Sequence, residues 1–233
     1  DMAVPAAILF DFDGVIVDSE RLHHETMVEA MAGDGPETPW SFYHENLMGL
    51  DDRGALTVLL RRAGIEPTPE ELQRRIDRKA VIFAGHAEDG RVAALPGSVA
   101  LVRACAAAGP VGLCSGALRS DIEPVLKALD VEDCFSAQVT ADDVSDSKPD
   151  PMSYRLCMEQ LATRFPEAGI APATCVAIED TTDGIASARG AGLAVVAVAT
   201  NLPADVLRAT GAAAVVETLE ELTPEALAEH AGL

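Results

Sequence analysis

Short runs of apolar residues recur along the chain, each bounded by acidic, polar or turn-forming residues. A run of about four to six apolar residues is typical of a strand buried on both faces, as in a parallel sheet. Six segments have this pattern: 6–10, 111–114, 137–140, 174–178, 194–198 and 213–216. The pattern therefore predicts a parallel sheet built from these strands.

Helical patterns separate most of the predicted strands. They predict helices over residues 98–108, 121–129, 151–161 and 183–191. Pro124 would lie in the first turn of its helix, where its missing N–H is tolerated, and Asp150 would cap a helix that starts at Pro151. This alternation of strands and helices predicts a doubly wound α/β domain.

The alternation fails between the first two strands. Residues 18–89 contain no strand pattern and instead predict helices over 20–31, 53–63 and 70–83. We therefore predict an inserted all-helical cap domain at residues 18–90 and an α/β core domain at residues 1–17 and 91–233. Because two links join the cap to the core, we expect the cap to hinge over the ends of the strands.

Acidic residues directly follow the first predicted strand. Ligands of an open α/β sheet bind at the carboxyl ends of its strands, so the sequence Asp11-Phe12-Asp13-Gly14 is a candidate site. Side chains two residues apart on an extended chain point the same way, so both carboxylates can face one ligand. Two close negative charges need a cation, a shared proton or access to water.

Polar residues also stand at the other predicted strand ends. Ser115-Gly116 follows the second strand, Glu179-Asp180 follows the strand at 174–178, and Lys148 precedes a helix. Carboxylates with open positions suit Mg²⁺, while the lysine and the serine suit phosphate oxygens. The set favours phosphoryl transfer, which needs a nucleophile, a cation and an acid–base group.

Charge and cysteine content narrow the functional classes. With 17 Lys and Arg against 38 Asp and Glu, the net charge is −21, which argues against nucleic acid or an anionic membrane as a partner. The five cysteines form no C-x-x-C motif and several lie in apolar runs, which predicts buried free thiols. We expect a cytoplasmic protein without a signal peptide, monomeric or, as an alternative, dimeric.

At these residues the chain resembles the haloacid dehalogenase (HAD) superfamily. The family motif D-x-D-G appears at Asp11–Gly14, its Ser/Thr at Ser115, its lysine at Lys148, and its acidic pair at Glu179 and Asp180. These motifs occur in the expected order and span the chain. The helical insert resembles the cap of the subgroup that holds phosphoglycolate phosphatase and β-phosphoglucomutase.

The resemblance implies a role for each motif residue. Asp11 would be the nucleophile that forms an aspartyl-phosphate, and Asp13 would be the general acid and base. Ser115, the N–H of Gly116 and Lys148 would bind the transferring phosphate, with Lys148 counted among the catalytic residues. Mg²⁺ would be held by Asp11, the backbone carbonyl of Asp13, Glu179 and Asp180.

The cap residues are less constrained by the pattern. His23 on the first cap helix and Gly49 in a cap loop match positions with which related caps reach the substrate, and Arg53 is displaced by one residue from the arginine of that loop. The expected activity is Mg²⁺-dependent hydrolysis of a small phosphorylated metabolite, a sugar phosphate or a phosphoglycolate-like ester. A phosphosugar mutase is one alternative, although Met48 stands where the mutase carries a lysine. A non-catalytic binding protein on the same fold is the other.

Overall fold

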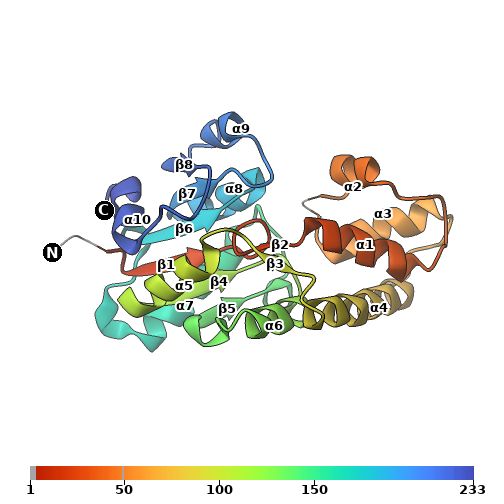
Figure 1. Cartoon of the computed structure of the whole chain (residues 1–233), viewed down its shortest axis with the longest axis horizontal. Helices are drawn as coiled ribbons and strands as arrows, with labels where there is room; N and C mark the ends of the chain where they lie inside the picture. Colours follow the sequence, from red (N-terminus) through yellow and green to blue (C-terminus); the bar gives the residue numbers. More distant parts are fainter. Residues whose placement is uncertain (1–3, 49) are drawn as a thin grey trace.

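The computed structural model describes residues 4–48 and 50–233. It contains a larger α/β part and a smaller helical part, shown in Figure 1. The larger part is a six-stranded parallel sheet, within the described residues, in the order β5-β4-β1-β6-β7-β8. Its strands are β1 (Ala7–Phe10), β4 (Val111–Cys114), β5 (Ala137–Val139), β6 (Cys175–Glu179), β7 (Ala194–Val198) and β8 (Ala214–Val216). The predicted fold class is confirmed, and each predicted strand lies within one residue of its expected bounds.

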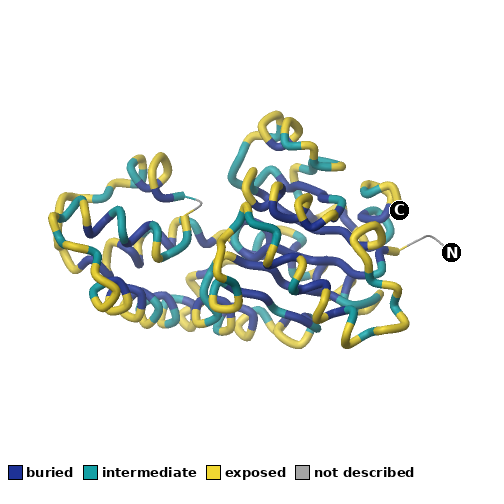
Figure 2. The backbone as a smooth tube through the Cα atoms, turned by 180° about the vertical axis from the view of Figure 1, so that it is seen from behind, coloured by how far each residue is buried: buried dark blue, intermediate teal, exposed yellow. Residues whose placement is uncertain are grey.

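Helices cover both faces of the sheet. Those of the core are α5 (Ser98–Ala108), α6 (Arg119–Ala128), α7 (Met152–Arg164), α8 (Thr182–Gly190), α9 (Ala204–Arg208) and α10 (Pro224–Ala231), with short 3-10 turns η1 (Glu132–Cys134), η2 (Ala141–Asp143), η3 (Pro166–Ala168) and η4 (Pro172–Thr174). Side-chain alternation along β1 divides the core: Ile8 and Phe10 pack with α5, α6 and α10, whereas Ala7 and Leu9 pack with α7, α8 and α9. Figure 2 shows the strands as the most buried part of the chain.

Chain order reverses at β1. The chain runs outward from β1 through β4 to β5, then crosses back to β6, β7 and β8 on the other side. In open α/β sheets such a reversal opens a crevice at the carboxyl ends of the strands, and ligands bind there. The residues that follow β1, β4 and β6 are therefore the ones that the topology places around the crevice.

Four helices form the smaller part, which lies beyond the strand ends in Figure 1. They are α1 (Glu20–Met31), α2 (Trp40–Asn46), α3 (Asp52–Arg62) and α4 (Pro69–Glu88), and we call them the cap. Apolar side chains of all four pack into a hydrophobic cluster of their own. A two-stranded antiparallel ribbon of β2 (Val17–Asp18) and β3 (Ala93–Ala94) stands where the chain passes between core and cap. The predicted domain boundaries fall beside this ribbon.

Local details differ from the sequence prediction at two helix starts. Helix α6 begins at Arg119, so Pro124 lies inside it and not in its first turn, and the helix gives up one hydrogen bond there. Helix α7 begins at Met152, whose N–H donates to Asp150 Oδ1 at 2.9 Å. The N-cap is therefore Pro151 and not Asp150, so the predicted start is one residue too early, although Asp150 still accepts the first helical N–H.

The five cysteines are free, and Cys105, Cys114, Cys157 and Cys175 are buried, as the apolar runs predicted. No helix within residues 4–48 and 50–233 has both the length and the apolar character that a membrane span requires.

One core contact gives a test of the packing between β4 and α7. A Cβ placed on Gly112 would lie 2.4 Å from Cys157 Sγ and 3.2 Å from Leu161 Cδ1. Gly112→Ala should therefore lower the free energy of unfolding by about 1–3 kcal/mol, measured by chemical denaturation. Gly109→Ala is the matched control, because nothing lies within 4 Å of a Cβ there. Adding Cys157→Ala should restore part of the loss; no recovery would place the strain elsewhere.

Candidate active site

The chain turns sharply after β1 and brings the D-x-D-G motif to the crevice. Asp11 follows the strand directly, and Gly14 has a φ of 76°, which favours glycine. A Cβ on Gly14 would also lie 2.0 Å from Asp180 Oδ2. Gly14 therefore lets the chain turn and lets Asp180 approach it.

Lys148 reaches this crevice from the loop before α7. Its Nζ donates to Asp11 Oδ1 at 2.8 Å and to Glu179 Oε1 at 2.6 Å. The hydroxyl of Tyr154 donates to the same Glu179 oxygen at 2.7 Å. Burial disfavours the ammonium group, but the attraction of Asp11 and Glu179 outweighs it and raises the pKa of Lys148. Lys148 is therefore a permanent positive charge beside Asp11.

Three carboxylates at the strand ends form a candidate metal site. Asp11, Glu179 and Asp180 are buried and offer ligand atoms within 4.8 Å of one another. Asp180 Oδ2 accepts a hydrogen bond from Asn201 at 2.8 Å, while its buried Oδ1 has no hydrogen-bond partner among residues 4–48 and 50–233. A buried carboxylate oxygen without a partner is costly unless a cation binds it. The donor set fits a hard divalent cation.

Repulsion within this group shifts its acid–base behaviour. Burial and the nearby Glu179 carboxylate raise the pKa of Asp11 to about 7, against the lowering effect of Lys148. Burial, with Asp11 and Glu179, raises the pKa of Asp180 well above its ordinary value. In the metal-free protein these groups therefore compete for protons, and a bound cation would displace those protons.

The side chain of Asp13 points to the cap and not to the acidic cluster. Its Oδ1 accepts a hydrogen bond from Ser19 and lies 3.1 Å from His23 Nε2. Burial opposes ionisation of Asp13, but the charge and hydrogen bond of His23 and the hydrogen bond of Ser19 lower its pKa. Burial and Lys79 act against protonation of His23, yet Asp13 raises the pKa of the imidazole. The two groups form an ion pair between the core motif and the first cap helix.

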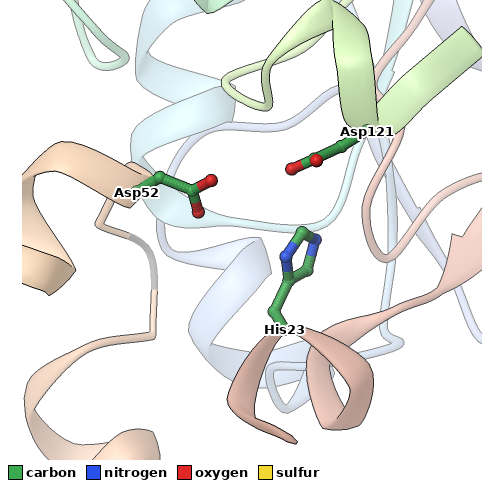
Figure 3. A group of neighbouring side chains, drawn as sticks. All are labelled: His23, Asp52 and Asp121. Carbon is green, nitrogen blue, oxygen red and sulfur yellow. The ribbon is translucent and has the colours of Figure 1, made fainter. Parts of the chain in front are cut away.

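A second group of ionisable side chains includes His23 (Figure 3). His23, Asp52 of the cap and Asp121 of the core offer ligand atoms within 4.8 Å of one another. Lys79 of α4 already supplies a cation there, with its Nζ 2.9 Å from Asp52 Oδ2 and 2.5 Å from Asp121 Oδ2. Lys79 and Asp121 are buried and Asp52 is half-buried, so this ion pair joins cap and core largely away from water.

The predicted phosphate-binding residues follow β4. Ser115 is 2% exposed, and its Oγ accepts a hydrogen bond from the N–H of Ala117 at 3.0 Å, which caps the turn. Gly116 is exposed and lines a cavity of about 340 Å³ between core and cap, together with Asp11, Asp13, Lys148 and His23. Five of the ten predicted site residues thus line one cavity, while Ser115, Glu179 and Asp180 are not among its described lining residues.

Two predicted cap residues lie elsewhere. Gly49 is outside the described residues. Arg53 is exposed and lines a neighbouring hollow of about 360 Å³, and it is not among the described residues that line the main cavity. Met48 does line the main cavity.

Comparisons with known proteins show the family to which the chain belongs. Residues 8–198 match the family described as haloacid dehalogenase-like hydrolases, and the chain belongs to it. The chain is 32% identical over 197 residues to hexitol phosphatase B of Escherichia coli, covering 82% of this chain and 83% of the relative. It is 27% identical over 196 residues to protein CbbY of Rhodobacter capsulatus, covering 82% and 83%. The resemblance drawn from the motifs is confirmed.

Similarity extends to the three-dimensional structure. The crystal structure of CbbY from Rhodobacter sphaeroides in complex with phosphate aligns with a TM-score of 0.82 at 25% identity. The alignment covers 94% of this chain and 96% of that one, so cap and core are both included.

Sequence reasoning missed several residues that hold the site together. Tyr154 supports Glu179 and lies six residues after Lys148, on α7, where its apolar surroundings suggest a core residue. Asn201, which donates a hydrogen bond to Asp180, lies three residues after the end of β7. Its position after a strand could have marked it as a site residue. Lys79 and Asp121 gave no signal, because only the packing of cap against core pairs them.

Cation binding should depend on pH at this site. Mg²⁺ needs ionised carboxylates, so its stabilising effect should grow as the pH rises from about 6 to about 8, through the pKa of Asp11 near 7. The measurement is the thermal midpoint with and without Mg²⁺ across this range. Asp180→Asn should abolish most of the effect; an equal effect in that variant would contradict the assignment.

The Lys79 ion pair should carry a large share of cap–core stability. Lys79→Met would leave Asp121 buried without a cation and should cost about 3 kcal/mol in chemical denaturation. Lys127→Met, at an exposed position on α6, is the matched control. The double variant Lys79→Met/Asp121→Asn should recover part of the loss, and a double variant no more stable than the single one would argue against the pair.

Proposed function

We propose that this protein is a Mg²⁺-dependent phosphatase that hydrolyses monoesters of a small sugar or polyol through a phosphorylated Asp11. The observation that carries the proposal is the meeting, at the strand-end crevice, of Asp11, its bound Lys148 and the partnerless Asp180 oxygen. This arrangement supplies a nucleophile, a fixed positive charge and a place for a divalent cation.

The first step is attack by an Asp11 carboxylate oxygen on the phosphorus. The new oxygen–phosphorus bond forms as the ester bond to the sugar oxygen breaks, and Asp13 gives a proton to that leaving oxygen. In the second step water attacks the phosphorus, Asp13 accepts a proton from the water, and Asp11 is released with free phosphate. Asp11 is 7% exposed, which limits access of water before the ester is bound.

Lys148 and Gly116 serve the transferring group. The Lys148 ammonium reduces repulsion between Asp11 and the incoming phosphate, and Gly116 offers a backbone N–H at the cavity wall. Bound at Asp11, Glu179 and Asp180, a Mg²⁺ ion would further neutralise phosphate charge. Glu179 also accepts the 2.6 Å hydrogen bond from Lys148, so the same carboxylate would contact both the ammonium group and the Mg²⁺ ion.

Asp13 must carry a proton to act as the acid. In the conformation described here it is paired with His23 and ionised. Entry of a phosphate dianion beside it disfavours that charge and favours proton uptake. The contacts of Asp13 with Ser19 and His23 belong to the cap, so the position of the cap sets whether Asp13 faces the ester or the cap helix.

The cavity suits a small ester. Its volume of about 340 Å³ lies near the lower end of small-molecule sites. Hexitol phosphatase B, one of the relatives, acts on a phosphorylated polyol by its name, and the polar side chains in the mixed lining of this cavity suit the hydroxyl groups of such a substrate. A phosphorylated protein side chain would have to enter between cap and core, where Asp51 already contacts Ser147 at 2.9 Å.

Phosphate release from a panel of esters tests the proposal. The panel holds hexitol, hexose and pentose phosphates, phosphoglycolate and β-glucose 1-phosphate, each assayed with Mg²⁺ and with a chelator. Asp11→Asn should lower kcat at least about a thousandfold while the protein stays folded, because an amide is a poor nucleophile. Asp133→Asn, at an exposed position in η1, is the matched control.

The rival activities give different outcomes. Isomerisation of β-glucose 1-phosphate without phosphate release would identify a mutase. Substantial turnover in Asp11→Asn would refute the nucleophile, and binding without any turnover would favour a non-catalytic protein.

A further inference from the structure

The main cavity has two chemically different ends. Its core end holds Asp11, Lys148 and Gly116, which receive the transferring phosphate in the proposed reaction. Its cap end is formed by helix α1 and by the loop that leads into α3, with Glu20 and Asp51 on the wall. The part of a substrate remote from the reacting phosphate must therefore lie against the cap end.

Asp51 is fixed across the opening between cap and core. Its Oδ1 accepts the N–H of Gly54 at 2.7 Å, which caps α3, and its Oδ2 accepts the hydroxyl of Ser147 at 2.9 Å. Ser147 is the residue before Lys148, so this hydrogen bond joins the cap end of the cavity to the loop that carries Lys148. None of its contacts is with a cation in the described structure.

Glu20, on helix α1, adds a second carboxylate to the cap end. Its Oε2 accepts the hydroxyl of Tyr43 at 2.8 Å, which holds the carboxylate at the cavity wall. Asp52 also lines the cavity, but it is paired with Lys79, which it shares with Asp121. Among the described residues, Asp51 and Glu20 are thus the carboxylates at this end that form no ion pair with a lysine or an arginine.

The available cations are engaged elsewhere. Among the described residues that line the cavity, the basic side chains are Lys148, His23 and His44. Lys148 is bound to Asp11 and Glu179, and His23 is paired with Asp13. His44 is exposed. A second anionic group on the substrate would meet carboxylates without a fixed cation.

We propose that Asp51 and Glu20 restrict this site to esters that carry a single phosphate and whose remainder is uncharged or cationic. Sugar bisphosphates and phosphorylated carboxylic acids are excluded by charge repulsion at the cap end, while hydroxyl or amino groups donate hydrogen bonds to the same two carboxylates. This inference rests on the proposed phosphatase function and names its substrate class.

Four esters with one carbon skeleton test the selectivity. Glucose 6-phosphate has a neutral remainder, glucosamine 6-phosphate a cationic one, and 6-phosphogluconate and glucose 1,6-bisphosphate anionic ones. We expect kcat/KM for the first two to exceed that for the last two by at least about tenfold, mainly through KM. Raising the ionic strength from about 0.05 to about 0.5 M should narrow the gap, since salt screens repulsion between partly exposed charges.

Charge-removing variants assign the effect to residues. Asp51→Asn keeps an N-cap acceptor for α3, and Glu20→Gln keeps an acceptor for Tyr43. Each should lower the ratio of kcat/KM between glucose 6-phosphate and glucose 1,6-bisphosphate by about threefold to tenfold. Asp130→Asn is the matched control: this residue is exposed on the core, its φ of 55° suits asparagine, and the ratio should not change.

The outcomes separate this inference from the proposed function. Equal use of the bisphosphate and the monophosphate by the wild type, or an unchanged ratio in both variants, would overturn the selectivity. Absence of phosphate release from every ester would instead count against the phosphatase. In that case calorimetry still tests the selectivity, by measuring how tightly the wild type binds glucose 6-phosphate and glucose 1,6-bisphosphate. Tighter binding of the bisphosphate would overturn the inference, and tighter binding of the monophosphate would support it.

Discussion

Repulsion between buried carboxylates governs the arrangement of this site. The parallel sheet brings Asp11, Glu179 and Asp180 to one edge, within 4.8 Å of one another and away from water. Such a group is stable only if protons or cations compensate it. Lys148 supplies one cation from the loop before α7, and the partnerless oxygen of Asp180 leaves room for another. The chemistry expected of the site thus follows from the way its charges are balanced.

The same constraint recurs where the cap meets the core. Asp121 of the core and Asp52 of the cap share the buried ammonium of Lys79, and His23 stands beside them (Figure 3). His23 in turn pairs with Asp13 of the D-x-D-G motif. A chain of charged contacts therefore runs from the cap–core junction to the residue assigned as the acid, which gives the position of the cap a direct effect on Asp13.

At the cap end of the cavity, two carboxylates have no positively charged partner among the described residues. Asp51 and Glu20 are held by neutral hydrogen-bond donors, so their charges remain available to act on a bound substrate. A site that attracts phosphate at one end and repels anions at the other discriminates by the number of charged groups on the ligand. In the proposed function, these two carboxylates would select the substrate.

The sequence by itself determined the strands of the sheet, most helices, the presence of a helical insert and the residues at the strand ends. These features follow from local signals: short apolar runs, helix-capping residues, and polar groups placed directly after strands. They also sufficed for the family resemblance, since its motifs lie next to strands or helix starts. Helix α2 and the β2–β3 ribbon escaped prediction, because α2 has only seven residues and each ribbon strand two.

Only the tertiary structure decided which charged and polar side chains pair with one another. Lys79 is a surface-like residue in the sequence, yet it is fully buried between Asp52 and Asp121, 27 and 42 positions away. Tyr154 and Asn201 support Glu179 and Asp180, and Arg53, the more obvious cap cation, lies outside the main cavity. The Lys79 pairing depends on how the cap packs against the core, whereas the other two depend on how α7 and the segment after β7 pack beside the end of β6. Electrostatic interactions act between neighbours in space, whereas sequence patterns report only neighbours along the chain.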